Sequence, residues 1–370
     1  MDPVTAKLMS AAGAAADPVY VDDVFSTFLY EGTGADQTIA NGIDLSGEGG
    51  MVWIKNRESS DDHYVFDTER GATKYIFTNS SQQEYDISTT LKSFTSTGFT
   101  LGLYDGVNRN NTGVCSWTFR KCPGFFDVVT YTGNGSHRDI SHSLGSEPGS
   151  IWIKRTDSSE SWVVYHRSLD SGGGSGATAH FAKLELESSG EQFGGTLLWS
   201  SSGGGEDHTA STFHVSSHSS VNANGGSFVA YIFAHNDQSF GDDGDEAIIK
   251  CGSYTGNGTS GSSVNNIDLG FEPQWVLIKK TSGSGNWLLF DTMRGFTTVG
   301  VLDEYLYANS SAAGADHQYG GPTATGFQVE GTDGDANGNG SSYIYMAIRR
   351  PHKPPEAGTD VFALDTSDNT

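Results

Sequence analysis

The chain of 370 residues carries 21 Lys and Arg against 45 Asp and Glu, which gives a formal net charge of −24. Such a charge repels nucleic-acid phosphates and anionic membrane surfaces, so the sequence excludes nucleic acid as a partner. The three cysteines form no CxxC pair, and no run reaches the roughly 18 apolar residues of a membrane helix, which excludes a disulfide or zinc framework and membrane insertion.

The first predicted element is a short helix near the N-terminus. Asp2 is placed to cap it, and Pro3 fits the first helical position. The helix has too little apolar surface to bury itself, so residues 1–19 form either a frayed terminus or a docking segment that orders against another subunit. We favour docking, and the contact residues are then Val4, Leu8 and Met9.

The rest of the chain predicts strands. Apolar runs of four to eight residues, rich in Val, Ile, Tyr, Phe and Trp, lie between clusters of Gly, Ser, Asn and Asp. Because no amphipathic helices separate these runs, they favour antiparallel sheets packed as sandwiches. The clearest runs are residues 51–54, 126–131, 151–153, 228–234, 275–278 and 343–348.

One set of motifs occurs three times along the chain. Each copy opens with an aromatic turn signature, continues with a glutamate and a hydrophobic strand ending in lysine, and closes with a short strand, an Asn-x-Asn turn and a last apolar strand. Twelve residues after the lysines come Asp67, His166 and Asp291. A register held over so many elements indicates three modules of common ancestry. The signatures begin at Tyr30, Tyr131 and Tyr254, the lysines are Lys55, Lys154 and Lys279, and the turns begin at Asn108, Asn222 and Asn337.

We therefore predict an all-β chain of three tandem, related antiparallel β-sandwich modules of jelly-roll or lectin-like type, preceded by a short anchor segment. Short connections indicate close coupling, and Gly/Ser tracts at 171–176 and 200–205 predict long loops in the second module. The last residues begin a strand with nothing to pair with, so the chain is either the front of a longer product or pairs its tail with another subunit. The predicted divisions are 1–19, the docking segment; 20–125, 126–247 and 248–356, the modules; and 357–370, a tail or the start of a further element.

The repeated acids raise the question of a glycosidase, which needs two carboxylates facing one sugar. The glutamates before the strands are Glu48, Glu147 and Glu272. Asp67 and Asp291 would be their partners, but the middle copy has His166 at that position. We favour the alternative that the glutamates accept turn amides and the aspartates close hairpins. The sequence also has no HExxH, GxSxG or Walker motif, so we expect a protein that is not an enzyme.

One loop raises the question of calcium. Its acids and amide, Asp333, Asp335 and Asn337, match the first half of an EF-hand loop, but Ile344 stands where the loop requires its last carboxylate. A calcium site and a plain Asx/Gly hairpin turn both remain open, and no other cofactor is expected.

Five tryptophans next to Asn- and Asp-rich loops invite interpretation as platforms for sugar rings. Most of them recur at matching strand positions, and recurring strand aromatics in a sandwich are more often core residues. We therefore expect them in the core, and the sequence identifies no residues for glycan contact. They are Trp53, Trp152, Trp162, Trp275 and Trp287.

Several longer strings carry a family resemblance. Among them are VYVDDVFSTFLYEGTG, SWTFRKCPGFFDVVTYTGNG, SLGSEPGSIWIKR and IRRPHKPPEAGTDVF. Across essentially the whole chain, the sequence resembles repetitive virion proteins of tailed phages of marine bacteria, including cyanophages. The resemblance implies concanavalin-A-like or related β-sandwich domains in tail fibres, appendages or capsid decorations. It assigns no functional residues.

The residues and the resemblance together predict a non-enzymatic virion structural protein. We expect a tail-fibre or appendage subunit on the particle, assembled in the host cytoplasm, docked through its N-terminus to other tail or capsid proteins and projecting sandwiches that contact host surface glycans. It is expected to be a homo-oligomer, with a trimer as one form, although no coiled-coil heptads appear. The alternatives are a capsid decoration protein and a lectin-like adhesin that uses calcium.

Overall fold

The computed structural model describes residues 17–169, 182–193, 198–199, 208–259 and 263–354. The protein is nearly all β, with several antiparallel sheets, which confirms the predicted fold class. Within these ranges, no helix combines the length and the apolar character needed to cross a membrane. Val4, Leu8, Met9, both Gly/Ser tracts and the predicted tail at 357–370 lie outside the described residues. Below, modules 1, 2 and 3 denote residues 20–125, 126–247 and 248–356.

Each module contributes one large sheet with the same strand order. In module 1 the order is β1 (Phe25–Glu31), β9 (Gly113–Arg120), β3 (Gly50–Asn56), β4 (Tyr64–Asp67), β5 (Lys74–Phe77) and β6 (Tyr85–Asp86). In module 2 it is β10 (Phe126–Thr132), β15 (Ser227–Phe233), β12 (Ser150–Arg155) and β13 (Val163–His166). In module 3 it is β16 (Ile249–Thr255), β24 (Ser342–Arg349), β18 (Pro273–Lys280), β19 (Trp287–Asp291), β20 (Asp303–Tyr307) and β21 (Ala315–His317). Strands far apart in sequence therefore pair at the same places in all three.

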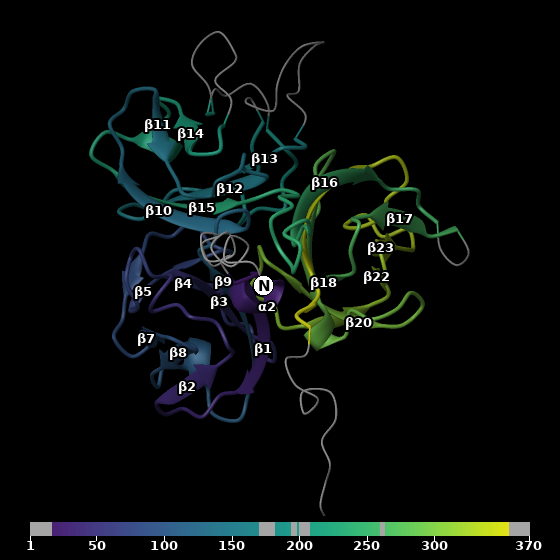
Figure 1. Ribbon diagram of the computed structural model, residues 1–370, viewed down its shortest axis with the longest axis horizontal. Coiled ribbons are helices and arrows are strands. Elements are labelled where there is room, and N and C mark those ends of the chain that lie inside the picture. Colours follow the sequence, from purple (N-terminus) through teal and green to yellow (C-terminus); the bar gives the residue numbers. More distant parts are fainter. Residues whose placement is uncertain (1–16, 170–181, 194–197, 200–207, 260–262, 355–370) are drawn as a thin grey trace, which may run out of the picture.

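A smaller sheet lies outside each large one (Figure 1). Module 1 has β2 (Gln37–Ala40), β8 (Gly98–Leu101) and β7 (Leu91–Thr95); module 2 has β11 (Arg138–Ser141) and β14 (Thr212–Val215). Module 3 has β17 (Asn265–Asp268), β23 (Gly326–Val329) and β22 (Gly320–Thr323). Short helical turns occur at α2 (Val21–Val24), α3 (Asp105–Asn108), α4 (Ser219–Asn222) and η3 (Thr292–Arg294).

The strand sequences follow from burial on both faces of the large sheets. All seven residues of β3 are buried. Val52 and Ile54 point into the core of module 1, whereas Met51 and Trp53 belong to a cluster shared by the three modules. A strand covered on both faces needs a nearly continuous apolar run. This explains the uninterrupted runs in the sequence and confirms the six predicted strands.

The largest hydrophobic cluster joins the three modules at the centre, where their large sheets meet (Figure 1). It contains all five tryptophans considered as sugar platforms, each at most 3% exposed, which confirms that they are core residues. A fully buried apolar side chain contributes about 1.5–3 kcal/mol. The shared core therefore holds the modules in one compact, three-lobed arrangement. The interfaces between neighbouring modules are called seams below: the first lies between modules 1 and 2, the second between modules 2 and 3, and the third between modules 3 and 1.

The recurring turn signature and the Asn turn bind each other in every module. The tyrosine hydroxyls donate to the carbonyls of Val107, Val221 and Ala336. The glycine two residues after each tyrosine lies against the backbone of this turn: a Cβ on Gly32 would come 2.1 Å from the Arg109 carbonyl oxygen. The signature therefore recurs because only glycine fits this close approach.

Candidate functional site

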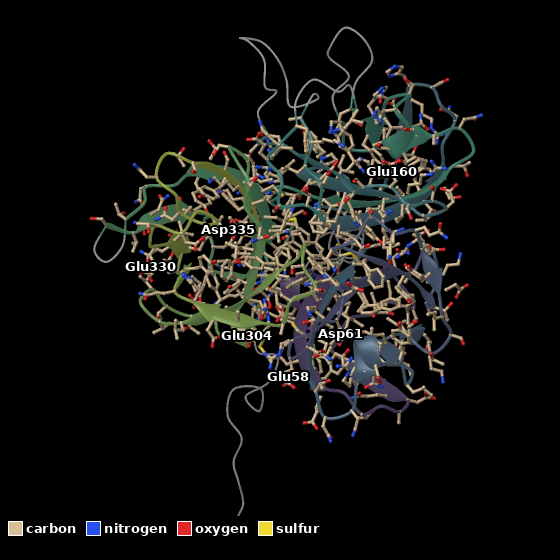
Figure 2. The ribbon with its side chains drawn as sticks, turned by 180° about the vertical axis from the view of Figure 1, so that it is seen from behind. Glu58, Asp61, Glu160, Glu304, Glu330 and Asp335 are labelled. Atoms are coloured by element: carbon tan, nitrogen blue, oxygen red, sulfur yellow. The ribbon has the colours of Figure 1, made fainter. Side chains whose placement is uncertain are left out.

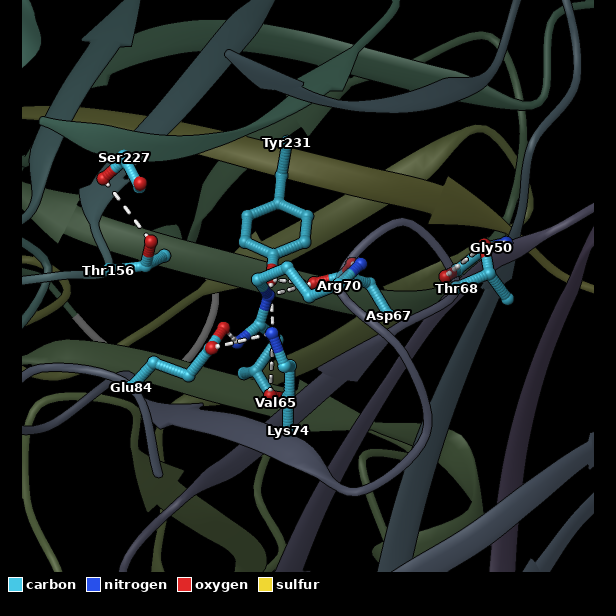
Figure 3. Close-up of polar contacts among 10 residues, drawn as sticks. All are labelled: Gly50, Val65, Asp67, Thr68, Arg70, Lys74, Glu84, Thr156, Ser227 and Tyr231. Carbon is cyan, nitrogen blue, oxygen red and sulfur yellow. Dashed lines mark hydrogen bonds and ion pairs between the residues drawn. The ribbon is translucent and has the colours of Figure 1, made fainter. Parts of the chain in front are cut away.

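Asp67, which is expected to close a hairpin rather than to act as a glycosidase acid, lies at the first seam, between modules 1 and 2 (Figure 3). Its Oδ2 accepts a hydrogen bond of 2.7 Å from the Tyr231 hydroxyl on β15 of module 2. The same oxygen lies 2.5 Å from Nε of Arg70, whose backbone amide donates to Oδ1 at 2.8 Å. Asp67 thus closes the turn after β4, as predicted, and also connects two modules.

Arg70 has a full set of partners at this seam. Its guanidinium donates to Glu84 at 3.2 Å, to the Val65 carbonyl at 3.0 Å and to the Tyr231 hydroxyl at 3.1 Å. Burial disfavours its charge, but Asp67 and its other partners together raise the pKa of Arg70. The guanidinium therefore stays charged, and its planar fork fixes the carboxylates around it.

The third seam, between modules 3 and 1, repeats this arrangement. Nε of Arg294 lies 2.6 Å from Oδ2 of Asp291, and both side chains are fully buried. Nε1 of Trp117 on β9 donates to the same oxygen at 3.0 Å. Trp117 and Tyr231 occupy equivalent positions, three residues after the partners of Tyr30 and Tyr131 in the large sheets. Each aspartate therefore meets a donor from the next module.

The second seam, between modules 2 and 3, uses different groups at the same positions. His166 replaces the aspartate, Leu169 replaces the arginine, and Met346 on β24 occupies the donor position. A ring nitrogen of His166 lies 3.0 Å from the carbonyl oxygen of Tyr345. Burial lowers the pKa of His166 to about 3, so the ring is neutral at neutral pH and can donate to that carbonyl.

The three recurring lysines also bridge the seams. Each Nζ donates to carbonyls of its own loop and to one carbonyl of the neighbouring module: Lys55 to Ser311 at 3.1 Å, Lys154 to Ser81 at 3.1 Å and Lys279 to Ser189 at 3.1 Å. Burial lowers the pKa of each lysine to about 8, which leaves the ammonium groups protonated at neutral pH. Because module 1 contacts 3, module 2 contacts 1 and module 3 contacts 2, the contacts form a closed ring.

The calcium candidates have local amide partners. The two carboxylate oxygens of Asp335 accept from the backbone and side chain of Asn286, at 3.0 and 3.1 Å. An Asp333 oxygen accepts from the Asp335 amide at 2.7 Å. Among the described residues, no group of three or more His, Cys, Asp and Glu side chains could hold a metal ion. Calcium at this loop stays a prediction.

Asn337 has a role that recurs in the other modules. Its side chain accepts from the Asn257 amide at 3.0 Å and donates to the Gly331 carbonyl at 3.0 Å. Asn108 and Asn222 likewise accept from an amide of their own signature loop and donate to the carbonyls of Gly102 and Ser216. The asparagine therefore joins two loops of a module, whether or not an ion binds beside it.

The first seam opens to solvent as a groove of about 550 Å³ beside Arg70. On the module 1 side, Nζ of Lys74 lies 3.3 Å from Oε1 of Glu84, whose other oxygen is held by Arg70 (Figure 3). On the module 2 side lie hydroxyl side chains from three strand ends: Thr130, Thr132, Thr156 and Ser227. A second groove, beside Arg57, has about 340 Å³ and is lined by module 1 alone. Arg57 forms an ion pair of 3.1 Å across the third seam with Glu304, which is labelled in Figure 2.

The two described ends of the chain meet in a separate pocket of about 580 Å³. Oδ2 of Asp22 accepts from the backbone amides of His352 and Lys353, at 3.1 and 3.2 Å. The Tyr20 ring packs edge-on against His352, and its hydroxyl donates to Asp242. The start of module 1 is thus hydrogen-bonded to the end of module 3, and this contact of Asp22 with His352 and Lys353 is called the clasp below.

Sequence reasoning did not identify Arg70, Arg294, Tyr231 or Asp22 as important residues. A signal existed for the two arginines, since both follow an aspartate at the same spacing, in FDTERG and FDTMRG. The remaining two residues have partners that are distant in sequence, and no local pattern marks them.

The fold and the seams define an all-β protein whose large antiparallel sheets pack around one shared core. A family model described as a domain of unknown function (DUF7483) matches residues 21–351, and the chain belongs to this family. The match spans all three modules, in agreement with their common core. A search of curated proteins finds no match.

Proposed function

We propose that this protein is a non-enzymatic structural subunit of a phage particle, most simply a tail-fibre or appendage component that docks through its N-terminus and exposes its β-sandwich modules to the host surface. The observation that carries the proposal is the clasp of Asp22 with His352 and Lys353. Because Asp17 and Pro354 line the same pocket, the described domain begins and ends on one face. A domain attached through that face leaves its three lobes accessible.

The chemistry of the first and third seams supports a structural role. The acids that suggested a glycosidase, Asp67 and Asp291, each bind an arginine and a donor from the neighbouring module. A glycosidase acid must instead face a sugar and exchange protons with it. The net charge of −24 suits a protein that is crowded on a particle surface, since like charges keep such surfaces from associating non-specifically.

Docking is tested by changing the apolar residues of the N-terminal segment. The variant Val4→Ser, Leu8→Ser, Met9→Ser should lose incorporation into particles while its thermal unfolding stays unchanged. Polar exchanges in the same segment, Thr5→Ser with Ser10→Thr, serve as the control. Normal incorporation of the triple variant would reject docking through this segment.

Location separates the leading proposal from capsid decoration. An electron-microscopy map of the particle that contains this chain should show the three-lobed domain on a tail appendage. Density on the capsid lattice would favour the decoration protein, and absence from the particle would reject both. A lectin-like adhesin that depends on calcium predicts glycan binding that a chelator abolishes.

A further inference from the structure

The groove at the first seam has the features of a binding site for polar, uncharged ligands. Its volume of about 550 Å³ is within the roughly 300–1,000 Å³ range of small-ligand pockets. The walls come from two modules: module 1 contributes two cations and two carboxylates, and module 2 contributes hydroxyl groups and the carboxylate of Asp157. Such a surface offers both hydrogen-bond donors and acceptors to one ligand.

The carboxylate of Glu84 is held in place before any ligand arrives. Arg70, whose side chain is 3% exposed, holds one of its oxygens, and Lys74 holds the other. Arg70 is in turn fixed by Asp67 and Tyr231. Since a rigid polar group loses little entropy on binding, this support favours affinity for a ligand that bonds to Glu84 or Lys74.

The opposite wall carries hydroxyls that face solvent. Thr130, Thr132 and Ser227 are exposed, and Thr156 is half-buried with its hydroxyl 3.2 Å from the Ser227 carbonyl oxygen. Tyr131 and Phe228 also line the groove, and their rings stack with centroids 5.1 Å apart. The exposed hydroxyl groups suit a ligand that is itself rich in hydroxyl groups.

The charges of the groove select against anions. The two lining cations, Arg70 and Lys74, both pair with Glu84, while Glu69 pairs with Lys121 and Asp157 pairs with Arg155, on a chain whose net charge is −24. An anionic sugar would be repelled at long range and would compete with Glu84 for the two cations. A neutral sugar instead exchanges hydroxyl hydrogen bonds with both walls and adds no charge.

We propose that the groove between modules 1 and 2 binds neutral oligosaccharides. The recognising groups are Lys74, Glu84 and the hydroxyls of Thr130 and Thr132. The inference rests on the proposed function in one respect, since a particle protein that contacts the host would meet host surface glycans as its ligands. It names the surface of contact and the class of glycan, which neither the sequence nor the family identifies.

The test measures binding of the full-length protein to an array of neutral and anionic oligosaccharides, followed by titration calorimetry of the best neutral binder. Lys74→Gln should weaken that binding about tenfold, because a charge-assisted hydrogen bond is lost. Lys92→Gln is the matched control: Lys92 is 42% exposed against 41% for Lys74, and each lysine pairs with a carboxylate. The control should bind as the parent does.

A second pair of variants tests the other wall without changing charge. Thr132→Val removes one exposed groove hydroxyl at nearly constant shape and should also weaken binding, whereas Thr38→Val on the outer sheet of module 1 should not. Equal effects of groove and control variants, binding of anionic glycans alone, or no glycan binding at all would overturn the inference. If the chain sits on the particle but binds no glycan, only the groove inference fails; if it binds as described but is absent from the particle, only the proposed function fails.

Discussion

The first and second seams place different chemistry in the same geometry. At the first, Asp67 and Arg70 form a buried ion pair that accepts a bond from Tyr231; at the second, His166 stands opposite the Tyr345 carbonyl. Three positions differ together, since Leu169 and Met346 replace the arginine and the donor. A buried aspartate needs both a cation and a donor, whereas a neutral histidine can use a backbone carbonyl that is always present. The groups at the three positions of one seam therefore depend on one another, and we call them a matched set.

The strongest test of this comparison removes the acid at each seam. Asp67→Ala and Asp291→Ala should each cost about 3–5 kcal/mol of unfolding free energy, because each removes the buried carboxylate of an ion pair, with Asp67→Ala at the lower end since Arg70 keeps Glu84. His166→Ala should cost less, about 1–3 kcal/mol, since it removes a buried neutral ring and its hydrogen bond to a carbonyl but leaves no unpaired charge. Urea denaturation of the three variants measures the difference. Equal losses of unfolding free energy at all three seams would show that the ion pairs contribute no more to stability than the histidine does.

Transplanting the second seam into the first tests the matched set directly. Asp67→His alone should destabilise, because it sets an imidazole beside Arg70. Adding Arg70→Leu and Tyr231→Met should recover about 2 kcal/mol of the loss, as coupled neighbours are not additive. The readout is the coupling free energy from the corresponding cycle of single and combined variants. If the triple variant loses as much unfolding free energy as the three single variants lose in sum, the three positions are not coupled and the matched set is contradicted.

Acid should weaken the second seam selectively. Burial lowers the pKa of His166 to about 3, below its ordinary value of 6.5. The unfolded chain therefore binds a proton that the folded chain does not, and stability is lost as the pH falls from about 6.5 towards 3. Between pH 7.5 and 4.5 the parent should lose about 3 kcal/mol more than His166→Gln, whose amide can still donate to Tyr345. The other histidines affect both proteins alike, so identical pH profiles would refute this role of His166.

Much of the fold was predictable because it follows from local patterns. The apolar runs predicted the strands of the large sheets, and the recurrence of Asp67, His166 and Asp291 marked positions that do share one place in each module. The role of those positions was not predictable, because the partners of Asp67 and Asp291 lie 164 and 174 residues away. The groove escaped prediction for the same reason: Lys74 and Thr130 come from different modules, and only the ring brings them together.

The third seam differs from the other two in one further respect, because no connecting segment ties its modules together. The clasp takes that place: Asp22 at the start of module 1 accepts two amides at the end of module 3. Asp22→Ala should cost about 1–2 kcal/mol of unfolding free energy, whereas Asp22→Asn, which keeps an acceptor oxygen, should cost less. Asp44→Ala is the control, since Asp44 caps only its own turn through Ser46 and Gly47. Hydrogen exchange should show the loss concentrated at β1 and β24, and a loss no larger than that of Asp44→Ala would mean that the core alone closes the ring.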